Sequence, residues 1–76
     1  MTNTAIFSNG HKVTRNGKIK YAFAWLVDLK NANGHRVIQS GMTHNKASAE
    51  KNMNRELKAC TKFGYTAEQF SEVIEL

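Results

Sequence analysis

Residues Lys18–Lys30, KIKYAFAWLVDLK, form the longest alternating run in the chain. Every odd position is apolar: Ile19, Tyr21, Phe23, Trp25, Val27 and Leu29. Because side chains leave a β-strand on alternate faces, this period of two predicts a central strand whose odd face belongs to the core. The even face is expected to stay open and to be basic at one end, with Lys18, Lys20, Ala22, Ala24 and Leu26.

Turn-forming residues around this run predict its neighbours. Asn16-Gly17 favours a type I′ hairpin, so a strand over His11–Arg15 is expected to pair with the central strand. Asn31–Gly34 predicts a second turn, followed by a strand over His35–Ser40. Ser8–Gly10 marks an earlier turn or bulge.

A helix is predicted over about Lys46–Lys62, after N-cap candidates at Thr43–Asn45. One side of this helix is apolar, and the opposite side carries a basic stripe that is more typical of a solvated face than of a binding site: Lys51, Arg55, Lys58 and Lys62. Gly64 suits the left-handed position that ends a helix.

The chain after this helix is expected to add one strand. Thr66–Gln69 has the form of a capping box and predicts a short turn. Ser71–Leu76 favours a strand because Val73 and Ile74 are β-branched. The predicted fold is therefore α+β: a three-stranded antiparallel meander packed on one helix, then a short C-terminal strand (βββαβ), in a single domain over residues 1–76.

The charge of the chain is unevenly distributed. Its 76 residues carry a net charge of +5. Residues 1–46 hold seven basic side chains and one acidic one, a net +6, whereas residues 47–76 hold four basic and five acidic ones, a net −1. A positive field confined to the strand region predicts a polyanionic partner.

Several chemical functions have no support in the residue pattern. The single cysteine, Cys60, lies on the apolar helix side, which favours a structural role over a nucleophilic one. The three histidines lack metal-ligand spacing, and the glutamates form no paired carboxylates. We therefore expect no enzyme, no cofactor and no metal.

The chain start, MTNTAIFSNG, lacks the features of a signal peptide. The longest apolar run, Tyr21–Val27, is far too short to cross a bilayer. Together with the lone thiol, these features predict a soluble, cytoplasmic protein without a membrane partner.

A sequence motif in the second half resembles a known small domain. Between Leu29 and Leu57, the chain resembles the YegP-like domain of unknown function. That family combines a strand ending in Leu-Lys, an Asn-Gly turn, a strand Val-Ile-x-Ser and a helix opening Lys-Ala-x-Ala-Glu. The matching residues are Leu29, Lys30, Asn33, Gly34, Val37, Ile38, Ser40, Lys46, Ala47, Ala49 and Glu50. The family is usually a tandem of such units, whereas this chain has one.

The order of three strands and a helix is also similar to integrase arm-binding domains and to plant ethylene-response-type DNA-binding domains. Those domains place a sheet in the major groove of DNA. This resemblance and the charge favour a small non-enzymatic protein that binds the phosphate backbone of DNA or RNA through Lys12, Arg15, Lys18, Lys20 and Arg36.

The alternative is an inhibitor from a phage or mobile element, comparable to anti-CRISPR proteins, that acts on a host or defence protein complex. Its basis is the small size, the absence of catalytic groups and the open sheet face.

A short chain without disulfide or metal is also expected to pair with a second copy of itself as a homodimer.

Overall fold

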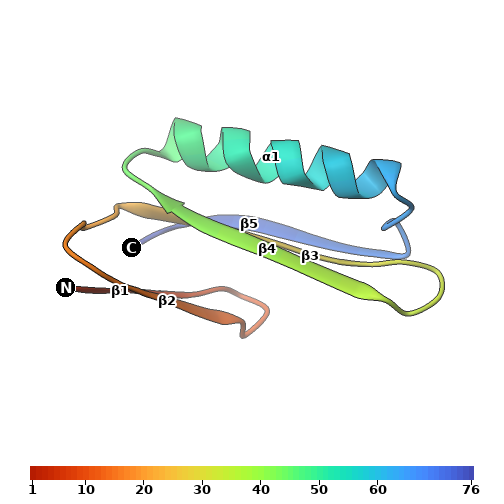
Figure 1. Ribbon diagram of the computed structural model, residues 1–76, viewed down its shortest axis with the longest axis horizontal. Helices are drawn as coiled ribbons and strands as arrows, with labels where there is room; N and C mark the ends of the chain where they lie inside the picture. Colours follow the sequence, from red (N-terminus) through yellow and green to blue (C-terminus); the bar gives the residue numbers. More distant parts are fainter.

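The computed structural model describes residues 1–76 and arranges them in three layers (Figure 1). A helix covers one face of a three-stranded sheet, and a two-stranded hairpin lies against the other face. The predicted α+β class, with a helix on an antiparallel sheet and a C-terminal strand, is confirmed. The elements are β1 (Thr2–Ile6), β2 (Lys12–Asn16), β3 (Phe23–Lys30), β4 (Arg36–Thr43), α1 (Lys46–Lys62) and β5 (Glu68–Glu75).

The three-stranded sheet has β3 at its centre, between β4 and β5, and all its pairings are antiparallel. Trp25, Val27 and Leu29 of β3 face α1 and form a core cluster with Ala49. Met53 and Leu57 pack against this cluster from the helix. The prediction that the odd positions of the alternating run are core is thus confirmed for β3.

The helix begins and ends at the residues that the sequence predicts. Asn45 caps the N-terminus, and its side-chain oxygen accepts a hydrogen bond of 2.8 Å from the Ser48 N–H. At the C-terminus, Gly64 has a φ of 91° and Tyr65 donates to the Cys60 carbonyl, which is a Schellman motif. The short turn predicted over Thr66–Gln69 is wrong, because β5 already begins at Glu68 and pairs with Lys30.

The predicted pairing of His11–Arg15 with the central strand is wrong. Residues 12–16 instead form β2, which pairs with β1 through a turn that contains Gly10 at a φ of 88°. A type I′ turn needs positive φ at both central residues, and neither Asn16 nor Gly17 has one. The Gly17 N–H instead donates to the Met1 carbonyl and extends the β1–β2 ladder.

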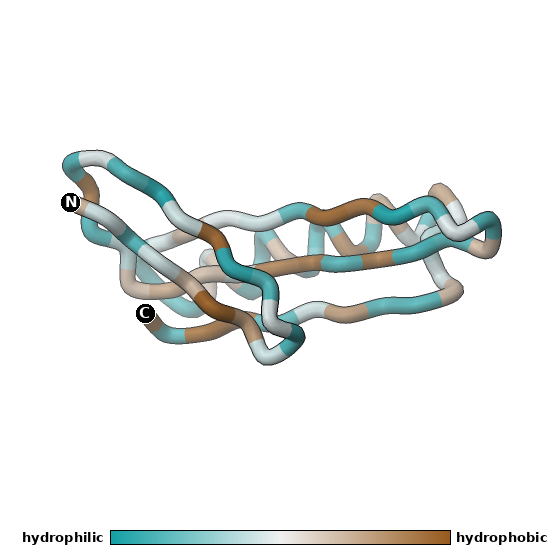
Figure 2. Tube along the Cα trace, turned by 90° about the horizontal axis from the view of Figure 1, so that it is seen from below, coloured by the Kyte–Doolittle hydropathy of each residue, from teal (hydrophilic) through white to brown (hydrophobic).

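The prediction of an open, basic sheet face on the even positions is also wrong. Lys18 and Lys20 precede β3, and Ala24 and Leu26 are 1% and 0% exposed. The hairpin covers Ala24 and Leu26, and these two residues form a second core cluster with Ala5, Phe7 and Met42. Figure 2 shows the hairpin lying across one end of the sheet and leaving the end near the β3–β4 turn uncovered.

No helix combines the length and the apolar character that crossing a membrane requires.

Candidate nucleic-acid interface

Four of the five predicted site residues lie in the N-terminal hairpin unit, which we define as residues 1–22. Lys12 and Arg15 are on β2, and Lys18 and Lys20 are in the connection from β2 to β3. All four side chains are exposed, and none takes part in an ion pair. The first acidic residue of the chain is Asp28, so the hairpin unit carries a charge of +4 that no acid within it offsets.

A buried asparagine fixes the connection that carries Lys18 and Lys20. The Asn3 side chain is on the inner face of β1, and this residue is 7% exposed. Its amide nitrogen donates to the Ile19 carbonyl at 2.7 Å, and its oxygen accepts from the Tyr21 N–H at 3.0 Å. These two bonds satisfy backbone groups that no neighbouring strand would satisfy, so the connection is held against the hairpin.

Two hollows border this connection. One, of about 200 Å³, is lined by Asn3, Arg15, Asn16, Gly17, Lys18, Ile19 and Tyr21. The other, of about 290 Å³, is lined by Met1, Thr2, Asn3, Thr4, Lys20, Tyr21 and Leu76. Tyr21 belongs to both, and its ring stacks on the His44 ring with 5.4 Å between centroids and 27° between planes. The structure therefore places cationic and aromatic groups around two concave surfaces.

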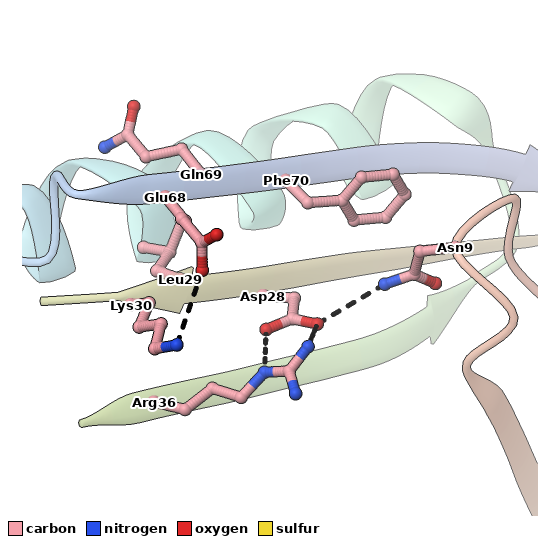
Figure 3. Close-up of a pocket in the computed structure, with 8 residues that line it drawn as sticks. All are labelled: Asn9, Asp28, Leu29, Lys30, Arg36, Glu68, Gln69 and Phe70. Atoms are coloured by element: carbon pink, nitrogen blue, oxygen red, sulfur yellow. Dashed lines mark hydrogen bonds and ion pairs between the residues drawn. The ribbon is translucent and has the colours of Figure 1, made fainter. Parts of the chain in front are cut away.

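The fifth predicted site residue, Arg36, lies apart from the other four and is already paired. It begins β4 at the uncovered end of the sheet and reaches across to Asp28 of β3 (Figure 3). Its Nε and Nη2 atoms donate to the two carboxylate oxygens, each at 2.7 Å. This bidentate hydrogen bond and the charge of Asp28 raise the pKa of Arg36. The structure does not join Arg36 to the hairpin cations.

The groove around this ion pair has no excess charge. It has a volume of about 200 Å³, and its lining includes Lys30 and Glu68, whose charged groups lie 3.8 Å apart. Asn9 of the hairpin turn also donates to Asp28 at 3.4 Å. Two cations and two anions therefore compensate each other here, and the groove offers little attraction to a polyanion.

The basic stripe of α1 is exposed, as the sequence predicts, but acidic side chains accompany it. Arg55 lies 3.9 Å from Glu56, and Lys46, which begins α1 outside the stripe, lies 3.9 Å from Glu50. No hollow of the structure opens on this side of the helix. The stripe is thus a weaker candidate for phosphate binding than the hairpin unit.

The thiol of Cys60 lies beside the core. Cys60 is partly buried and packs against the Trp25 cluster. Burial raises the pKa of the Cys60 thiol, and the negative charge of Glu56 raises it further, so the reactive thiolate is disfavoured. No group of three or more His, Cys, Asp or Glu side chains is placed to hold a metal ion.

Sequence reasoning missed Asn3 and the contact between Tyr21 and His44. Asparagine is rare inside strands, and nothing in its neighbours signals a buried amide. Tyr21 carries the alternation of the central strand and its partner His44 follows β4, so no local pattern connects the two residues.

No protein-family profile, curated protein or solved structure matches this chain. The resemblance to the YegP-like domain stays a prediction. Its Leu-Lys, Asn-Gly and Lys-Ala-x-Ala-Glu residues lie at the end of β3, in the β3–β4 turn and at the start of α1, which are positions that build the fold.

Proposed function

We propose that this protein binds nucleic acid through the hairpin unit, with Lys12, Arg15, Lys18 and Lys20 on the phosphate backbone. The observation that supports this proposal is the run of four exposed, unpaired cations in a segment without any acidic residue. Neutralising phosphates and releasing their counterions supplies most of the affinity of such contacts, and it needs no catalytic group.

The proposal moves the contact surface from the sheet to the hairpin. The sequence predicts the sheet face as the contact surface, but the hairpin buries Ala24 and Leu26 of that face, and compensated charges lie at its uncovered end. The hairpin unit carries its positive charge in a segment without any acidic residue, whereas Glu50 and Glu56 lie among the basic residues of α1.

The test is a pair of matched charge reversals. Lys18→Glu with Lys20→Glu changes the net charge from +5 to +1, and Lys58→Glu with Lys62→Glu on α1 changes it equally. All four lysines are exposed and unpaired, so the hairpin variant should keep the melting temperature, because such surface changes alter stability by about 0.5 kcal/mol or less. Lys62 lies in the last turn of α1, where a negative charge opposes the helix dipole, so the helix variant should lose about 1 kcal/mol and still fold.

Binding is measured by fluorescence anisotropy with labelled oligonucleotides across a salt series. The hairpin variant should lose binding, and each lost phosphate contact should flatten the log–log salt slope by about 0.7–0.9. The helix variant should bind almost as the natural chain does. The proposed surface would be contradicted if the helix variant lost binding while the hairpin variant did not, or if neither variant lost binding. Absence of oligonucleotide binding by the natural chain would contradict nucleic-acid binding.

A second candidate function is protein binding through the uncovered end of the sheet. Ile38 is 39% exposed there, beside the compensated charges of Asp28, Arg36, Lys30 and Glu68. A mixed surface of this kind is more typical of a protein interface than of a phosphate site. An inhibitor that acts on a host or defence complex would use this surface, and its binding would depend weakly on salt and would be lost on Ile38→Asp.

A further inference from the structure

We infer that the hairpin unit prefers single-stranded over duplex nucleic acid, because it combines a phosphate track with concave sites for unstacked bases around Tyr21. This inference rests on the proposed function and names the substrate class of the same surface. It would assign to Tyr21 a contact with a base, and to Arg15, Lys18 and Lys20 contacts with the flanking phosphates.

The first step of the argument is the position of the aromatic pair. Tyr21 lines both hollows of the hairpin unit, and its ring already stacks on His44. Aromatic side chains beside a cationic groove are the usual platform for single strands, since every base has a π face that can stack on them. Bases of a duplex are stacked inside the helix and have no free π face to offer to such a side chain.

The second step is the size and composition of the hollows. Their volumes of about 200 and 290 Å³ lie below the usual range of about 300–1,000 Å³ for sites that enclose a whole drug-sized ligand. They therefore suit one ring system at a time. Arg15 and Lys18 line the first hollow and Lys20 lines the second, so each has a cation at its margin for an adjoining phosphate.

The third step is the rigidity of the site. The Asn3 amide bonds to the backbone on both sides of Lys20, at Ile19 and at Tyr21. The hollows are thus built on a connection whose backbone is fixed before a ligand arrives, which lowers the entropic cost of binding.

The experiment compares single strands and duplexes of about 12 nucleotides, a length within the range of known single-strand sites. The probes are labelled oligo-dT, oligo-U and the dA·dT duplex, measured at one salt concentration. The natural chain should bind the single strands more tightly than the duplex. Comparing oligo-dT with oligo-U separates DNA from RNA as the source of the strand.

Tyr21→Leu keeps an apolar side chain against the core but removes the ring, and Tyr21→Phe keeps the ring. Tyr21→Leu should weaken single-strand binding by about 5- to 150-fold, the range that loss of one base stack produces, and should leave duplex binding unchanged. Tyr21→Phe should bind as the natural chain does. Phe63→Leu is the matched control, because Phe63 is 82% exposed at the end of α1.

A second measurement uses the unsubstituted protein, since Tyr21 also packs against the hairpin core. Ultraviolet crosslinking of a 5-iodouracil oligonucleotide, mapped by mass spectrometry, should label Tyr21 or His44. Labelling confined to residues outside the hairpin unit and His44 would overturn the inference.

The two proposals fail separately. If Tyr21→Leu binds single strands normally while the Lys18 and Lys20 reversal abolishes binding, the base sites are refuted and phosphate binding by the hairpin unit stands. If the lysine reversal is also silent, both proposals are refuted. Tighter binding of the duplex by the natural chain would overturn the single-strand preference directly.

Discussion

Gly41→Ala should destabilise the protein, although alanine is the better residue for most strands. Gly41 lies on β4 directly opposite Trp25 of β3. A Cβ at position 41 would lie closest to Trp25 Nε1, and it would also lie 2.8 Å from Cε2 and 3.0 Å from Cζ2. Carbon atoms pack at about 3.5–4.0 Å, so the contact with Cε2 alone would force the indole to move by about 0.7 Å, and the contact with Nε1 would force a larger movement. Trp25 is only 6% exposed and is held by the cluster under α1, so this space is not free.

The expected magnitude follows from two opposing contributions. Overpacking a filled core costs about 1–3 kcal/mol. Replacing glycine restricts the unfolded chain and contributes about 0.4–1 kcal/mol of stability where the backbone tolerates alanine. Gly41 has no positive φ, so this contribution applies. We expect a net loss of about 1–2 kcal/mol, which lowers the melting temperature by about 4–16 °C for a domain of this size.

Gly17→Ala is the matched control, because Gly17 also lacks a positive φ and a Cβ there would meet no atom within 4 Å. It should stabilise the protein by about 0.4–1 kcal/mol. Urea unfolding followed by far-UV circular dichroism measures both variants. Trp25→Phe removes Nε1 from the contact, so Gly41→Ala should cost less in that background. An equal cost in both backgrounds, or a gain in stability on Gly41→Ala alone, would refute the steric argument.

Three further predictions concern side-chain hydrogen bonds and the thiol. Asn3→Ala should cost about 2 kcal/mol in chemical unfolding, because it leaves two backbone groups without partners, whereas an unchanged stability would contradict the role of the amide. The Ser8 hydroxyl and N–H donate to Glu72 and lower its pKa. The unfolded carboxyl has a pKa of about 4.3, so the stability that Ser8→Ala removes should be full near pH 6 and should disappear as the pH falls below about 4. A difference that is constant with pH would exclude this linkage. Cys60 should react slowly with a thiol reagent in the native state, because its pKa is raised, and fast labelling without unfolding would show that it is accessible.

The parts of the fold that sequence patterns predict correctly are those with local signals. The central strand follows from its period of two, and the Asn31–Gly34 turn follows from residues that tolerate left-handed backbone. The bounds of α1 follow from Asn45 before it and Gly64 after it. Each of these signals lies within a few residues of the structure that it specifies, so the rest of the chain is not needed to interpret it.

The candidate site is predictable to the same extent. Lys12, Arg15, Lys18 and Lys20 are close together in the sequence, and the structure keeps all four in the hairpin unit, with Lys12 and Arg15 on opposite faces of β2. Arg36 is separated from that segment by β3, and the sheet register places it beside Asp28 instead. The hollows around Tyr21 depend on Asn3 and on both chain ends, which no local pattern connects.

The covering of the sheet's second face depended on contacts between distant residues. Asn16-Gly17 can form a hairpin turn locally, but residues 12–16 pair instead with β1, which lets the hairpin bury Phe7 against the sheet. The even positions of the alternating run include only three apolar residues, Ala22, Ala24 and Leu26, which are too few to predict that this face is buried. The registers of β4 and β5 add Met42 and Ile74 beside them. Burying this apolar surface under the hairpin stabilises the observed fold. This stabilisation exceeds what the turn preference of Asn16-Gly17 would contribute to the predicted pairing.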